Sequence, residues 1–93
     1  MDYQPRAVIV GAGPNGLTAA ARLAMAGWSV DIYERADWAG GAAASSAEIF
    51  PGTIVDLGAA GHPFGVASPA FHALDLESHG LRWLNAPYPM AHP

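Results

Sequence analysis

The fold is decided by residues 7–16, AVIVGAGPNG. Residues 7–10 form a continuous apolar run with three β-branched side chains, which is typical of a strand buried on both faces in a parallel sheet. Glycines 11, 13 and 16 follow in a GxGxxG pattern. Residues 15–26 then show helical spacing, with Pro14 suited to the first turn and Gly27 to the C-terminal cap. The stretch therefore predicts a strand, a glycine turn and a helix.

A second strand is predicted at residues 29–33, SVDIY, and it completes a βαβ unit. Such units are right-handed almost without exception. The connecting helix carries one apolar stripe through Leu17, Ala20 and Ala24 and a second through Leu23. We expect this helix to be interior, because two apolar stripes need cover from both sides.

The rest of the chain predicts shorter elements. Residues 36–47 form a loop rich in Gly, Ala and Ser, and a β-hairpin is predicted with strands 47–50 and 53–57 flanking Pro51-Gly52. A helix is predicted to begin at Ser68-Pro69 and to end at Gly80, and residues 81–85 predict one more short strand.

The glycine pattern indicates chemistry because of its context. Gly11 suits the tight turn out of the strand, Gly13 lets backbone amides approach a pyrophosphate, and Gly16 permits close packing of helix on strand. Glu34 lies 18 residues beyond Gly16, at the end of the second strand, where a carboxylate accepts hydrogen bonds from ribose hydroxyls. This carboxylate would repel a 2′-phosphate, which disfavours an NADP-type ligand. The alternative is a purely structural glycine turn with Glu34 as a solvated acid.

Composition excludes several classes of function. The chain is 52% hydrophobic and only 13% charged, so it is not intrinsically disordered. A net charge of −4, with no lysine among its four basic residues, argues against nucleic-acid binding. Without cysteine, and with no metal-ligand spacing among His72, His79 and His92, we expect no metal site. No stretch approaches the roughly 20 apolar residues of a membrane span, and we expect a cytoplasmic protein.

The same residues resemble the N-terminal portion of FAD-dependent oxidoreductases related to phytoene desaturases and amine oxidases. The resemblance is carried by residues 8–17, by Glu34-Arg35 and by the pair Gly40-Gly41, and residues 53–58 resemble the strand that follows. The family often has arginine beside the glycine pair, where this chain has alanine. The resemblance implies FAD as cofactor, with a binding set of Gly11, Gly13, Pro14, Asn15, Gly16, Glu34, Arg35, Gly40 and Gly41.

The resemblance also implies an α/β fold, a partial Rossmann-like FAD-binding domain built from a βαβ unit, a β-hairpin and a second helix. Residues 1–93 would be its N-terminal part, binding the ADP portion of FAD. The remaining sheet and a substrate domain would come from further chain or from a second polypeptide. We expect part of an oxidoreductase that acts on a small molecule and is inactive alone, with no catalytic residue identified.

Two other classes of function remain open. One is an NAD-binding module of a dehydrogenase, which needs the first glycine motif and Glu34 but not Gly40-Gly41. The other is a non-enzymatic remnant or interaction subunit that keeps the nucleotide-binding fold. Two polar residues are also open: Asp56 either meets a polar edge of the cofactor or caps the turn at Gly58, and His62 lies near the flavin or is solvated.

Overall fold

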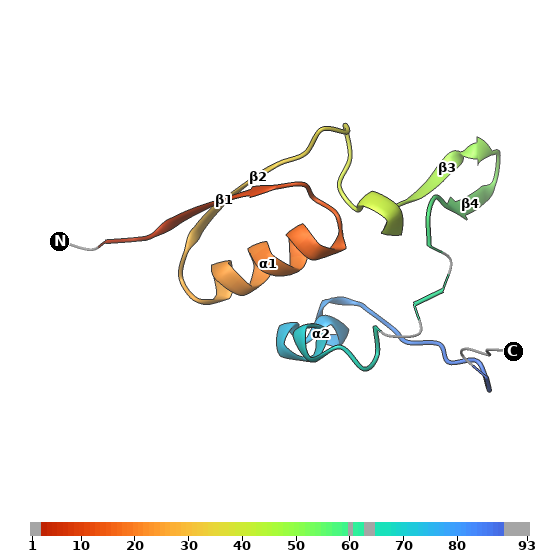
Figure 1. Cartoon of the computed structure of the whole chain (residues 1–93). Helices are drawn as coiled ribbons and strands as arrows, with labels where there is room; N and C mark the ends of the chain where they lie inside the picture. Colours follow the sequence, from red (N-terminus) through yellow and green to blue (C-terminus); the bar gives the residue numbers. More distant parts are fainter. Residues whose placement is uncertain (1–2, 60, 63–64, 89–93) are drawn as a thin grey trace, which may run out of the picture. The chain divides into compact units, whose positions relative to one another are not determined.

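The computed structural model describes residues 3–59, 61–62 and 65–88 and divides into two compact units, Met1–Ala60 and Gly61–Pro93. No helix in these described ranges is both long and apolar enough to cross a membrane. Figure 1 follows the elements along the chain: β1 (Arg6–Val10), α1 (Pro14–Met25), β2 (Ser29–Tyr33), η1 (Gly41–Ala43), β3 (Ser45–Phe50), β4 (Thr53–Asp56), α2 (Pro69–Leu74) and η2 (Leu76–His79).

The βαβ unit is formed as predicted. Strands β1 and β2 pair in parallel, with Arg6 opposite Ser29 and Val10 opposite Tyr33. The Gly11 N–H donates to the Tyr33 carbonyl at 2.7 Å and extends the pairing by one residue into the turn. Helix α1 connects the strands and packs along one face of the pair (Figure 1). These contacts confirm the α/β, Rossmann-like fold class.

Helix α1 begins and ends where its local sequence indicates. Pro14 occupies the first helical position, one residue earlier than predicted. At the other end Gly27 has a φ of +90°, and its N–H donates to the Ala24 carbonyl at 3.0 Å. The Trp28 N–H reaches the Leu23 carbonyl at 3.0 Å, which completes a Schellman motif. The helix is therefore fixed between a proline start and a glycine stop.

The prediction that the first strand is buried on both faces was wrong. Ala7 and Ile9 are half-buried, whereas Val8 is 62% exposed and Val10 is 86% exposed. The helix is not interior either, because Leu17 is 38% exposed. Within the first unit α1 packs on one face of the β1–β2 pair, and the outer face of the strands, with Val8 and Val10, is exposed.

The predicted hairpin is present. Strands β3 and β4 pair antiparallel, with Ser46 opposite Val55 and Phe50 opposite Thr53, and the register shifts between Ser46 and Phe50. Gly52 turns the chain at a φ of +80°. The first strand begins two residues earlier than predicted. After β4 the chain stays attached to the residue between η1 and β3, since the Leu57 N–H donates to the Ala44 carbonyl at 2.9 Å.

The second unit differs from prediction in two places. Helix α2 begins after Ser68, whose hydroxyl accepts the Phe71 N–H at 3.4 Å, as predicted. The helix ends early, because Asp75 adopts a φ of +49°, and the short η2 continues toward Gly80. No strand forms at residues 81–85 in the part of the chain that the structure describes. Trp83 stacks instead on Phe71, with ring centroids 6.5 Å apart.

Candidate functional site

The glycine turn between β1 and α1 contains three glycines with different steric surroundings. Gly11 has a φ of +99°, a conformation that favours glycine. Gly16 has no room, because a Cβ there would run into the Gly11 carbonyl oxygen and lie 3.3 Å from Ile9 Cγ2. Gly13 has an extended backbone, with φ −80° and ψ −176°, and a Cβ there would meet nothing nearer than Gly41 Cα at 4.0 Å. The protein itself therefore gives no steric reason for glycine at position 13.

The N-terminus of α1 opens beside Gly13. The first helical bond runs from the Leu17 N–H to the Gly13 carbonyl at 2.9 Å, so the amides of Asn15 and Gly16 precede the regular helical bonds. No side chain caps this end, and no acidic residue lies in the first turn. A helix end of this kind presents N–H groups and a partial positive charge, which together favour an anion such as phosphate.

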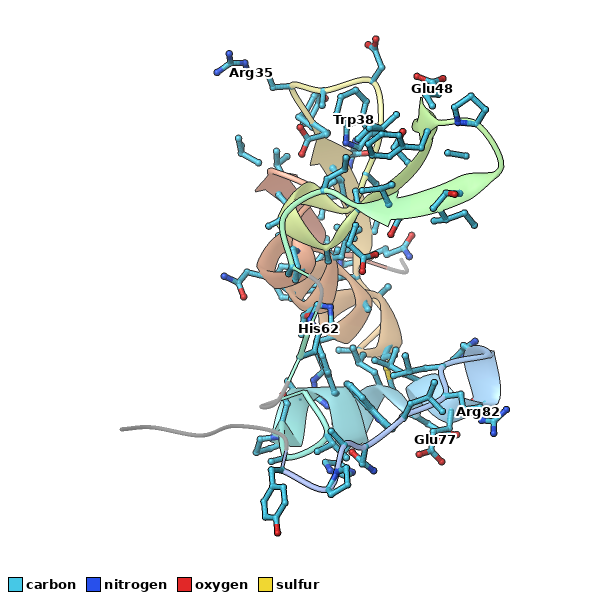
Figure 2. The ribbon with its side chains drawn as sticks, turned by 90° about the vertical axis from the view of Figure 1, so that its right-hand side faces the viewer. Arg35, Trp38, Glu48, His62, Glu77 and Arg82 are labelled. Atoms are coloured by element: carbon cyan, nitrogen blue, oxygen red, sulfur yellow. The ribbon has the colours of Figure 1, made fainter. Side chains whose placement is uncertain are left out.

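Glu34 follows β2 and reaches back to the glycine turn. Its Oε1 accepts the Ala12 N–H at 2.9 Å, and its Oε2 accepts the Ala36 N–H at 2.8 Å. The hydrogen bond from Ala36, then that from Ala12, and the neighbouring Arg35 charge hold the pKa of Glu34 below its usual value. Figure 2 shows the Arg35 side chain pointing away from the ribbon. The turn therefore carries a fixed, ionised carboxylate beside the helix N-terminus.

This carboxylate should make stability depend on pH in the acid range. A pKa lowered by folding gives a contribution that is complete above the unfolded pKa and is lost as pH falls through the folded pKa. We expect Glu34→Gln, which cannot titrate, to lose less stability than the wild-type chain between about pH 5 and pH 2.5. Urea denaturation followed by circular dichroism across that range measures this. If the free energy of unfolding of the two chains fell equally with pH, Glu34 would not be the carboxylate responsible for the loss of stability.

The pair Gly40-Gly41 lies directly against the glycine turn. The Gly40 N–H donates to the Ala12 carbonyl at 2.7 Å, and a Cβ on Gly41 would stand 3.0 Å from Gly13 Cα. Three segments that the sequence singled out separately thus meet around the first turn of α1. Sequence reasoning missed Ala12, which is buried and joins the other two segments through its N–H and its carbonyl. Its only signal was a small side chain between two glycines.

The remaining candidates lie elsewhere. Asp56 Oδ1 accepts the Ser45 hydroxyl at 2.7 Å across the hairpin, an arrangement that neither of its two proposed roles included. His62 is exposed and belongs to the second unit, where its carbonyl accepts the Gly65 N–H at 3.2 Å. Among the residues that are described, no three His, Asp or Glu side chains are placed to hold a metal ion. A cavity of about 310 Å³ in the second unit, beside Phe71, contains none of the expected cofactor residues.

A parallel βαβ unit, an open glycine turn at a helix N-terminus and an acid after the second strand define a dinucleotide-binding module of the Rossmann class. The chain belongs to the family of NAD(P)-binding Rossmann-like domains, whose pattern it matches over residues 9–76. It is similar to pyridine nucleotide-disulfide oxidoreductase domain-containing protein 2 of Rattus norvegicus and of Mus musculus, with 39% identity over 84 residues in each case. Each match covers 88% of this chain but only 14% of the relative, so the chain spans a small part of these proteins.

Proposed function

We propose that this chain binds the ADP portion of FAD, as the nucleotide-binding part of a flavin-dependent oxidoreductase that resembles the phytoene desaturases. One observation carries the proposal: Gly13 leaves room for a Cβ, with Gly41 Cα in ordinary contact at 4.0 Å, at the uncapped N-terminus of α1 and next to Ala12, whose N–H binds the carboxylate of Glu34. A Cβ at residue 13 would occupy that space without touching the protein closely. A ligand that occupies this space would explain why residue 13 is glycine.

The pyrophosphate would lie over Gly13 and the first turn of α1. The amides of Asn15 and Gly16 and the partial charge of the helix end would stabilise its negative charge. Pro14 has no N–H to offer, and its fixed φ holds the first turn in helical geometry. No residue of the first helical turn carries a negative charge that would oppose the phosphates.

Glu34 would receive the adenosine ribose. A carboxylate has about four acceptor positions, and the amides of Ala12 and Ala36 use two of them. Two positions remain, which match the two hydroxyls of an unmodified ribose. The ionised carboxylate would repel a 2′-phosphate, so we expect NADP to bind much more weakly than ligands with a free 2′-hydroxyl. Arg35 is exposed next to it and would lie at the rim of this subsite.

The resemblance favours FAD over NAD, because a glycine pair that matches Gly40-Gly41 lies along the FAD in that family. In this chain Gly40 lies against Ala12 and Gly41 against Gly13, where the pair would border the ligand beyond the pyrophosphate. When bound, FAD supplies its own redox chemistry, and this chain would bind and orient it. We assign no catalytic residue. NAD is the second candidate, favoured by the description of the matching family and by the name that the two relatives carry. A non-enzymatic remnant would keep the fold and show no turnover with either ligand.

We further propose that residues 1–93 are part of a larger domain, completed by further polypeptide from the same or a second chain. The exposed outer face of β1, with Val8 and Val10, supports this, because apolar sheet faces in parallel sheets are normally covered. A substrate domain for a small molecule would also lie in that further polypeptide. The lack of cysteine is compatible with the cytoplasmic location that we include in this proposal.

Equilibrium dialysis of the 93-residue chain against FAD, NAD and NADP tests the proposal. We expect FAD to bind most tightly and Glu34→Ala to weaken it by about ten- to a hundredfold, because the ribose loses charge-assisted hydrogen bonds and the Ala12 and Ala36 amides lose their acceptor. Asp37→Ala is the matched control, since it removes the same charge from an exposed position on the same loop. FAD affinity equal in the two variants would remove Glu34 from the site. Tighter binding of NAD than of FAD would support the second candidate.

A further inference from the structure

The peptide groups on both sides of Ala12 are held from outside the glycine turn. Its N–H donates to Glu34 Oε1 at 2.9 Å, and its carbonyl accepts the Gly40 N–H at 2.7 Å. Ala12 is only 4% exposed, although it lies in a connection between a strand and a helix. The two partners come from 22 and 28 residues further along the chain. This residue is therefore fixed by the segment after β2 and not by its own neighbours in sequence.

Gly41 adds a steric contact next to this hydrogen bond. Its φ is +54°, and a Cβ built on it would lie 3.0 Å from Gly13 Cα and 3.7 Å from Pro14 Cδ. The left-handed region near this φ admits alanine at modest cost, so backbone strain alone does not require glycine here. The close approach to Gly13 disfavours a larger residue, because the Gly13 backbone would have to shift by a few tenths of an ångström to admit a methyl group.

We propose that Gly40 and Gly41 are positioning residues, which hold the turn from Gly11 to Gly16 in the shape that receives a pyrophosphate. They act through Ala12 and Gly13, whether or not they also touch a ligand. The inference rests on the proposed function in that the ligand is a dinucleotide bound through its phosphates. A turn held in this way before binding needs less ordering when the ligand arrives, and affinity rises accordingly.

The positioning role predicts that Gly41→Ala weakens ADP and FAD by the same factor, about tenfold. ADP has the pyrophosphate but no flavin, so residues that only contact the flavin side of FAD cannot affect it. Gly52→Ala is the control, because it places alanine at a φ of +80° in the hairpin with nothing within 4 Å of the new Cβ. We expect it to leave both affinities unchanged. Equilibrium dialysis with each variant at a concentration where circular dichroism shows it folded separates affinity from stability.

The outcomes of this comparison are distinct. Equal losses for ADP and FAD with Gly41→Ala, and none with Gly52→Ala, support the positioning role. A loss for FAD alone overturns it and makes Gly41 a direct contact on the flavin side. ADP affinity within about twofold of wild type overturns it as well.

Hydrogen–deuterium exchange of the nucleotide-free chain keeps the inference testable if no nucleotide binds or if Gly41→Ala does not fold. We expect the Ala12 and Gly40 amides of the wild-type chain to exchange about as slowly as that of Leu17, which is bonded to the Gly13 carbonyl at the start of α1. Where Gly41→Ala folds, the Ala12 amide should exchange about tenfold faster. Wild-type exchange at the rate of an unbonded loop amide overturns the inference. Slow exchange without nucleotide binding would instead mean that the proposed function fails while the two contacts on the turn stand.

Discussion

Gly16→Ala is expected to destabilise the chain by at least about 3 kcal/mol, which is enough to unfold a βαβ unit of this size. The new Cβ would overlap the Gly11 carbonyl oxygen and would lie 3.1 Å from the Gly11 carbonyl carbon. Both atoms belong to the backbone at the end of β1, so relief requires α1 to move away from the strands. Urea denaturation followed by far-ultraviolet circular dichroism would measure the loss.

Gly27→Ala separates this clash from the general effect of replacing a glycine. Gly27 has a φ of +90°, but a Cβ there would meet nothing within 4 Å. We expect this variant to lose only the conformational preference of glycine, about 1–2 kcal/mol. If Gly16→Ala and Gly27→Ala unfolded at the same urea concentration, α1 would pack less closely on β1 than the structure has it.

Gly13→Val is expected to act mainly on nucleotide affinity, which should fall more than about a hundredfold, and to cost less stability than Gly16→Ala. The extended backbone at residue 13 suits a β-branched side chain. The nearest protein atom to the new Cβ would be Gly41 Cα at 4.0 Å, an ordinary contact. The side chain would therefore fill the space given to the pyrophosphate. Dialysis against FAD and ADP, with the urea midpoint of the same sample, measures both quantities.

Gly16→Ala tests the packing of α1 on β1, whereas Gly13→Val tests the phosphate site, although the two residues are only three positions apart. Retained FAD affinity in a folded Gly13→Val chain would place the phosphates elsewhere and would contradict the proposed site. A loss of stability as large as that of Gly16→Ala would mean that residue 13 acts through the fold. Gly13→Ala, with one methyl group, should give an intermediate loss of affinity.

The βαβ unit was predictable from the sequence because its signals are local. An apolar run, three spaced glycines, a proline start and a glycine stop each restrict a few neighbouring residues, and the structure places the elements within a residue of prediction. The exposure of Val8 was not predictable in this way. An apolar run indicates a strand that can be buried on both faces, but its cover depends on elements far along the chain.

Two errors in the second unit have a similar origin. Helix α2 stops at Leu74 because Asp75 adopts a left-handed conformation, and aspartate gives little warning of this in a sequence. Residues 81–85 have the composition of a strand, but a strand also needs a partner, and Trp83 packs on Phe71 instead. At the candidate site the glycines and Glu34 were predictable, whereas Ala12 was not, because its role arises from loops 22 and 28 residues away.

The double use of Glu34 limits how such a site can be redesigned. Switching a nucleotide site toward 2′-phosphorylated ligands usually begins by replacing the acid after the second strand with a neutral or basic residue. Here that exchange would also release the Ala12 and Ala36 amides. One carboxylate would thus set both which ribose is accepted and the shape of the turn that holds the phosphates. A change of ligand preference would need at least one compensating substitution in the loop after β2. A single substitution at Glu34 should weaken nucleotide binding before it creates a preference for a 2′-phosphorylated ligand.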